Sequence, residues 1–187
     1  MKHTIIAFVE DKPGVLNRIV SLFRRRNYNI NSLTVGPSET TGVSRMTIVT
    51  DESDSIRQDI ICKNLMKLIN VIDVKDVTKT PCVIRENVLI KLEVNGQNRE
   101  EIKNIVKQYN ARIADDGSLS LVVEVSDEDH RIESLIERLS NCNILEIVRS
   151  GKIAMVREHP NSRFDDSTVK NSEDLSWTTE QISNCLR

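Results

Sequence analysis

One short segment of the sequence combines residue types that could bind a small anion. It runs from Asp11 to Leu16 and contains Pro13 and Gly14. Pro13 suits the first turn of a helix, because the amide proton that proline lacks would have no partner there, and Gly14 lets a ligand approach the backbone closely. The first amides of a helix and the positive end of its dipole favour an anion such as a carboxylate. From local chemistry alone, an ordinary strand–turn–helix connection explains the segment equally well.

The sequence contains no recognisable catalytic or metal-binding motif. Its four cysteines lack CxxC spacing and predict neither a zinc site nor a disulfide framework. We expect each of the three widely separated histidines to be a solvated surface residue rather than a ligand or a base. No GxSxG, HExxH or GxxxxGK[ST] motif is present. We therefore expect no catalytic residue, no metal site and no cofactor in this chain. The residues concerned are Cys62, Cys82, Cys142, Cys185, His3, His130 and His159.

The composition is typical of a soluble globular protein. The 187 residues are 39% hydrophobic and 29% charged, and the net charge is −2. This charge gives no reason to expect nucleic acid or an anionic membrane as a partner, and only 3% of the residues are aromatic. No apolar run approaches the ~20 residues that span a bilayer. The first expected strand begins almost at Met1, so we expect no signal or transit peptide.

The hydrophobic pattern predicts the same order of elements twice, strand–helix–strand–strand–helix–strand. This order is ferredoxin-like, so the expected fold is α+β with two tandem βαββαβ domains. The first copy comprises strands 4–10, 29–35, 43–50 and 71–77 and helices 13–26 and 55–69. The helix at 55–69 is expected to be capped by Ser53 or Asp54. Its apolar residues are expected on one face: Ile56, Ile60, Ile61, Leu65, Leu68 and Ile69. The second copy comprises strands 88–94, 111–114, 119–125, 144–149 and 153–156 and helices 99–109 and 129–139. Each sheet then has one face without helices, and we expect another copy of the pattern, in the same chain or in a sister chain, to cover it.

These elements predict the domain limits. We expect a first domain at 4–78, a linker at 79–86 and a second domain at 87–158. Residues 159–187 are rich in Ser, Asn, Asp and Thr, so they predict a mostly disordered tail with at most one short helix. The tail contains Trp177, the only tryptophan, which is either loosely docked or an anchor onto a partner.

Several segments, taken in order, resemble the small regulatory subunit of acetolactate synthase (acetohydroxyacid synthase). The first half resembles an ACT domain, which is an amino-acid-sensing ferredoxin-like module. A lone Pro-Gly loop would not be specific, whereas this succession of segments is. The segments are 10–19, 28–37 and 43–49 in the first half and 89–91, 99–101 and 144–153 in the second half.

The resemblance implies a regulatory subunit that performs no chemistry itself. It implies a homodimer in which two ACT domains form one eight-stranded sheet, with valine bound at the seam between the loop after the first strand and the start of the second. The partner implied is the large catalytic subunit, which holds thiamine diphosphate, Mg and FAD, and which the small subunit activates and makes sensitive to feedback by branched-chain amino acids. The implied compartment is the bacterial cytoplasm or the plastid stroma. Carried over by position, the effector-binding residues are Asp11, Gly14, Val15, Leu16, Asn29 and Ile30.

Asp11 departs from the family pattern, since many members carry Asn at this position. An ionised Asp would repel the carboxylate of a ligand, although it could accept hydrogen bonds from the ammonium group or from loop amides. Two other functions remain open on the sequence. One is a stand-alone amino-acid sensor that regulates another enzyme or a transcription factor, although no helix-turn-helix is present. The other is a structural dimerisation module, which predicts no ligand response.

Overall fold

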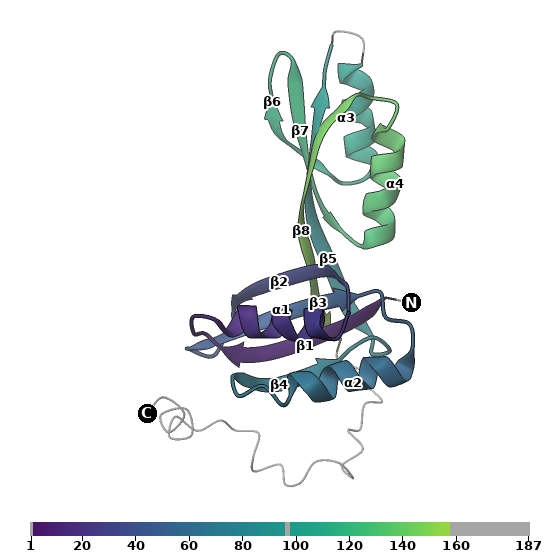
Figure 1. Cartoon of the computed structure of the whole chain (residues 1–187). Helices are drawn as coiled ribbons and strands as arrows, with labels where there is room; N and C mark the ends of the chain where they lie inside the picture. Colours follow the sequence, from purple (N-terminus) through teal and green to yellow (C-terminus); the bar gives the residue numbers. More distant parts are fainter. Residues whose placement is uncertain (1, 96–97, 158–187) are drawn as a thin grey trace. The chain divides into compact units, whose positions relative to one another are not determined.

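Two four-stranded antiparallel sheets, each with two helices on one face, make up the part of the chain that this computed structural model describes, residues 2–95 and 98–157 (Figure 1). The first half contains β1 (His3–Glu10), α1 (Val15–Arg25), β2 (Ile30–Pro37), β3 (Val43–Thr50), α2 (Ser55–Leu65) and β4 (Val71–Asp76). The second contains β5 (Cys82–Glu93), α3 (Arg99–Gln108), β6 (Arg112–Asp116), β7 (Ser120–Asp127), α4 (Asp129–Leu139) and β8 (Ile144–Val156).

The strand orders confirm the expected fold class. They are β2-β3-β1-β4 in the first sheet and β6-β7-β5-β8 in the second. In both sheets the first and third strands of the unit lie side by side at the centre, as the ferredoxin-like order requires. No helix among the described residues is both long and apolar enough to cross a bilayer. The expected tail at 159–187, including Trp177, lies outside the described residues.

The alternation in the central strands explains how the helices pack. On β1, Ile5, Ala7 and Val9 point to the same face and are buried with residues of α1 and α2. On β5, Ile90 and Leu92 are buried in the same way with residues of α3 and α4. Burying each of these Ile, Val and Leu side chains stabilises the fold by about 1.5–3 kcal/mol. Each half therefore has its own core.

The other face of the first sheet is covered by an extension of the second half. Strands β5 and β8 pair along their whole length and continue to the first sheet (Figure 1). There Ile6 on β1 packs with Val77 and with Ala154 on β8. The Arg45 guanidinium, on β3, donates a hydrogen bond to the Ala154 carbonyl. This part of the face is therefore covered by the same chain, which confirms one of the two expected alternatives.

The same extension corrects two expectations in the second half. The strand expected at 88–94 begins at Cys82, so residues 82–86 of the expected linker belong to β5. The strands expected at 144–149 and 153–156 are one strand, β8. Glu86 is buried in the middle of β5, and this charged residue interrupted the apolar alternation on which the prediction depended. The pairing shifts between Glu86 and Val88, where two residues of β8, Ser150 and Gly151, lie opposite one residue of β5. This β-bulge accommodates the extra residue of β8.

The first two helices are shorter than expected. Helix α1 begins at Val15 rather than at residue 13, because Gly14 has a left-handed conformation with φ +84. Helix α2 begins after Asp54, whose side chain accepts a hydrogen bond from the Ile56 amide at 2.9 Å and confirms Asp54 as one of the two expected caps. It ends at Leu65 rather than at residue 69.

The expected inward face of α2 is only partly correct. Ile61 and Leu65 are fully buried, whereas Ile56 is 69% exposed. Ile60 and Ile69 are exposed as well. Apolar residues occupy two opposite sides of this helix, so their spacing did not identify the side that packs on the sheet.

Candidate functional site

The loop between β1 and α1 presents the free amides of a helix start. Gly14 is the N-cap, no side chain caps the helix, and no acidic residue lies in its first turn. The Val15 amide donates to the Lys12 carbonyl at 3.3 Å, and the Arg18 amide makes the first helical bond, to Gly14. Within the described chain the amides of Leu16 and Asn17 have no acceptor. They are therefore available to an anion, as the residue types predicted.

Neighbouring segments hold this loop in place. The Glu10 amide donates to the Asn70 carbonyl at 2.9 Å, and the Asn70 side chain donates to the Glu10 carboxylate at 2.5 Å. The Asp11 amide donates to the Gly42 carbonyl at 2.8 Å. The hydrogen bond from Asn70, assisted by Lys12, lowers the pKa of the Glu10 carboxyl group. The backbone that leads into the helix start is thus fixed on both sides, whereas the Asp11 side chain is exposed.

The six residues predicted to bind the effector fall into two groups. Asp11, Gly14, Val15 and Leu16 lie at the start of α1, whereas Asn29 and Ile30 follow its end. The helix has eleven residues, so about 17 Å separates its two ends. Strand pairing agrees, because Ile30 and His3 both pair with Thr50 while Glu10 pairs with Val43 at the other end of the sheet. One chain therefore does not bring the two groups together.

The surface between the two groups is apolar and incompletely covered. Leu16 and Val20, one turn apart on α1, are 46% and 39% exposed. Strand β2, which carries the exposed Val35, is at the edge of its sheet and pairs only with β3 among the described strands. An edge strand beside an apolar helix face can add another strand. This side of the molecule therefore suits contact with a second chain.

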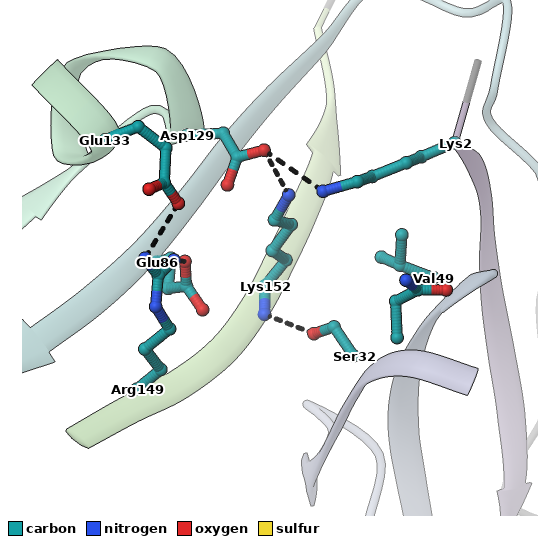
Figure 2. Close-up of a pocket in the computed structure, with 9 residues that line it drawn as sticks. Lys2, Ser32, Val49, Glu86, Asp129, Glu133, Arg149 and Lys152 are labelled. Carbon is teal, nitrogen blue, oxygen red and sulfur yellow. Dashed lines mark hydrogen bonds and ion pairs between the residues drawn. The ribbon is translucent and has the colours of Figure 1, made fainter. Parts of the chain in front are cut away.

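A second cluster, which the sequence did not reveal, lines a cavity of about 160 Å³ between the two halves (Figure 2). The Asp129 carboxylate accepts from Lys2 at 3.4 Å and from Lys152 at 2.7 Å. The Arg149 guanidinium contacts Glu86 at 3.0 Å and Glu133 at 2.7 Å. These charges are paired with one another, so we interpret the cluster as a joint rather than as a ligand site. The only sequence signal for it was a lone Glu in the apolar alternation of β5.

The electrostatics of this joint favour its charged form. Burial raises the pKa of the Asp129 carboxyl group, but hydrogen bonding and charge from Lys152 and then Lys2 outweigh burial, and the pKa is lowered. Burial lowers the pKa of Arg149, and its contacts with Glu133 and Glu86 outweigh that effect. The Lys2–Asp129 pair joins the two halves, whereas the pairs of Arg149 with Glu86 and Glu133 lie within the second half.

The prediction that His3 is solvated is wrong. Its side chain is fully buried, because His3 lies on the helix-facing side of β1 in the same alternation as Ile5. Its Nε2 lies 3.1 Å from the Asp76 carboxylate. His130 is exposed, as expected, and His159 lies outside the described residues.

Comparisons with known proteins agree with these features. Residues 5–73 match a family described as an AHAS small subunit-like ACT domain, and residues 85–158 match one described as the small subunit of acetolactate synthase. A probable acetolactate synthase small subunit from Archaeoglobus fulgidus is 43% identical over 157 residues, which cover 84% of this chain and 98% of the relative. The acetolactate synthase small subunit of Bacillus subtilis is 40% identical over 169 residues, which cover 90% and 98%.

A solved structure extends the likeness to three dimensions. The crystal structure of the acetolactate synthase small subunit from Thermotoga maritima has a TM-score of 0.78 and 32% sequence identity, and the match covers 85% of this chain and 99% of that one. Two family models, relatives matched over almost their whole length and a shared fold lead to the same conclusion. This chain belongs to the family of acetolactate synthase small subunits.

Proposed function

We propose that this chain, a small (regulatory) and non-catalytic subunit of acetolactate synthase, activates the large catalytic subunit and confers feedback inhibition by valine. The observation that carries the proposal is the uncapped start of α1 at Gly14, which offers free amides to a carboxylate. Thiamine diphosphate, Mg and FAD are expected in the catalytic partner. Whether the pair works in a bacterial cytoplasm or a plastid stroma stays a prediction.

The separation of the two groups of site residues supports a site shared by two chains. In a homodimer in which two β2 strands pair antiparallel, the Gly14 end of one chain faces the Asn29 end of the other. The amides after Gly14 would then take the α-carboxylate of valine. Asn29 of the other chain has both a donor and an acceptor for it, and the aliphatic side chains of Leu16 and Ile30 suit a small apolar group.

In this arrangement the negative charge of the Asp11 side chain suits the ammonium group of the ligand. Its amide is already used by Gly42, and its exposed carboxylate can accept from the ammonium group of the amino acid. A carboxylate at this position favours a zwitterionic ligand that turns its ammonium group toward Asp11 and its carboxylate toward the helix start. A simple carboxylic acid without the ammonium group should then bind poorly.

Regulation follows from linkage between the two binding events. Valine stabilises one arrangement of the paired ACT domains, whereas the catalytic subunit binds another better. The coupling between the two sites is reciprocal and typically amounts to ~1–3 kcal/mol. The catalytic subunit must therefore weaken valine binding by the same factor by which valine weakens the activated complex.

The test combines calorimetry on this chain with activity of the reconstituted holoenzyme. Valine, leucine and isoleucine are titrated, with phenylalanine as a control, and the same variants are assayed with the large subunit. Gly14→Asp adds bulk and negative charge where the carboxylate docks, so it should abolish the valine response and preserve activation. The control is Ser118→Asp, which adds the same carboxylate at an exposed turn of the second domain, outside the loop at Gly14.

Three outcomes separate the alternatives. Normal valine inhibition of the Gly14→Asp holoenzyme would refute the site. Binding of an amino acid without any effect on, or complex with, the large subunit would favour a stand-alone sensor. The absence of heat with every amino acid, together with activation of the large subunit, would leave an activator that does not sense valine.

A further inference from the structure

Three side chains with metal-binding atoms meet beneath α2, away from the loop at Gly14. His3 comes from β1, Cys62 from α2 and Asp76 from the end of β4. One ligand atom from each residue lies within 4.8 Å of those of the other two. These residues are far apart in the sequence, which is why no spacing motif predicted the cluster.

The imidazole of His3 is not satisfied by the protein alone. The side chain is 0% exposed, and its Nε2 lies 3.1 Å from the Asp76 Oδ2. Its Nδ1 is buried and has no hydrogen-bond partner in the described part of the chain. A buried polar atom without a partner destabilises the folded state. To share one ion with Asp76 the imidazole must use Nε2, so the ion would replace the hydrogen bond between them, and neutral imidazole is the form that binds metals.

The other two groups are held close to it. The Asp76 Oδ1 accepts a hydrogen bond from the Thr78 amide at 2.9 Å, which orients the carboxylate with Oδ2 toward His3. Cys62 is half-buried. Burial raises the pKa of its thiol to about 11, assisted by the carboxylates of Asp76 and Asp59. A thiol in this setting is protonated at neutral pH, and a nearby cation would offset the negative charges.

We propose that His3, Cys62 and Asp76 together bind one divalent transition-metal ion of the zinc type. Nitrogen, sulfur and oxygen are the ligand atoms that zinc takes in proteins, with solvent able to complete four-coordination. Metal–ligand distances of about 2.0–2.3 Å place neighbouring ligand atoms about 3.3–3.8 Å apart. The ligand atoms, within 4.8 Å of one another, would need to move by at most about 1.5 Å to reach that geometry. Binding forms the metal–sulfur bond and releases the thiol proton to solvent.

Such an ion would join three elements of the first domain. It would tie α2 to β1 and to the end of β4, two strands that already pair with each other. Because the ion would bind the folded state and not this arrangement in the unfolded chain, it should stabilise the domain. This site does not depend on valine, and its test is independent of the effector.

The test uses the full chain, reduced and freed of metal by a chelator, with Co²⁺ and Zn²⁺ as probes. We expect one Co²⁺ per chain with thiolate-to-cobalt charge-transfer absorption, displacement of that ion by Zn²⁺, and a higher Tm with Zn²⁺. Cys62→Ser should remove the absorption and the rise in Tm. Asp76→Asn, which keeps the shape of the side chain, should weaken binding by roughly tenfold or more.

The control variants are Cys82→Ser and Cys185→Ser, which should behave like the unmodified chain. Should the Cys62 variant fail to fold by circular dichroism, alkylation of the unmodified chain provides the readout, because Zn²⁺ should protect Cys62 from iodoacetamide. The proposal is overturned if Cys62→Ser keeps the absorption, if a control variant loses it, or if Zn²⁺ neither raises the Tm nor protects Cys62.

Discussion

Gly151 on β8 lies directly against Thr34 on β2. A Cβ atom added at Gly151 would come within 2.9 Å of the Thr34 Oγ1 and 3.0 Å of the Ser32 Oγ. Thr34 donates to the Lys152 carbonyl at 3.0 Å, and the Lys152 amide donates to the Ser32 Oγ at 2.7 Å. The strand that begins at the predicted effector residues is thus hydrogen-bonded to the strand that runs into the second domain.

The first prediction concerns the fit at this contact. Gly151→Ala should destabilise the protein by about 1–3 kcal/mol, because the new methyl group meets two side chains and because φ at this position is +83. Urea unfolding followed by circular dichroism measures the loss. Gly42→Ala has similar backbone strain without a close contact, so it should lose less. Equal losses in the two variants would show that the contact with Thr34 contributes nothing.

The second prediction concerns regulation through the same contact and rests on the proposed function. Thr34→Val keeps the shape of the side chain but removes the donor to Lys152. Calorimetry should show that valine still binds, since Thr34 is not a predicted ligand. Valine should inhibit the holoenzyme roughly fivefold more weakly, a change at the lower end of typical coupling between two sites. Thr34→Ser retains the hydroxyl and should restore inhibition. Unchanged inhibition in Thr34→Val would mean that the signal does not pass through this bond.

The third prediction concerns pH and the Asp129 carboxylate between Lys2 and Lys152. Its pKa lies below the ordinary 3.8 in the folded protein, so its stabilising effect is full above the unfolded value and is lost as pH falls through the lowered folded value. Asp129→Asn should therefore reduce the free energy of unfolding at neutral pH, by up to about 1 kcal/mol for this partly exposed group. The difference between variant and parent should shrink toward zero in strong acid.

The control for the pH experiment is Asp115→Asn, which alters an exposed carboxylate near the end of β6. Its effect on unfolding should be small at every pH. A difference for Asp129→Asn that persists unchanged in strong acid would mean that the side chain acts through packing rather than through its charge.

The fourth prediction concerns the apolar side of α1 and β2. Val20→Glu puts a charge at a half-exposed position that is not among the predicted ligands. If two ACT domains pair there, the variant should become monomeric by analytical ultracentrifugation and lose valine binding, although Gly14 and Asn29 are intact. Ile56→Glu, on the exposed side of α2, should leave the oligomeric state unchanged. A monomeric Val20→Glu variant that still binds valine would exclude a site shared between chains.

The repeated order of elements and the loop at Gly14 were predictable because they depend on local properties. Alternation along β1 and the 3.6-residue spacing of Val15, Ile19 and Phe23 in α1 each depend on residues a few positions apart, and the left-handed conformation at Gly14 is one that glycine adopts at little cost. The resemblance of consecutive segments then indicated the family.

Other features depended on which distant segments meet. The same apolar spacing in α2 fits two opposite faces, and only packing on the sheet decides that Ile61 is buried and Ile56 is exposed. Glu86 disrupts the alternation of β5, and only the approach of Arg149 from β8 makes its burial tolerable. Because of this pairing, the end of the expected linker belongs to β5, and the two strands expected at 144–149 and 153–156 form one strand, β8.

The sequence by itself determined the class of fold, the repeat, the helix start at Gly14 and the membership of the family, because these follow from periodicity and from short segments. Only the tertiary structure decided that β8 contacts β2 at Gly151 and that His3 meets Cys62 and Asp76. The physical reason is that each of these depends on contacts between side chains far apart in the chain, which local patterns do not encode.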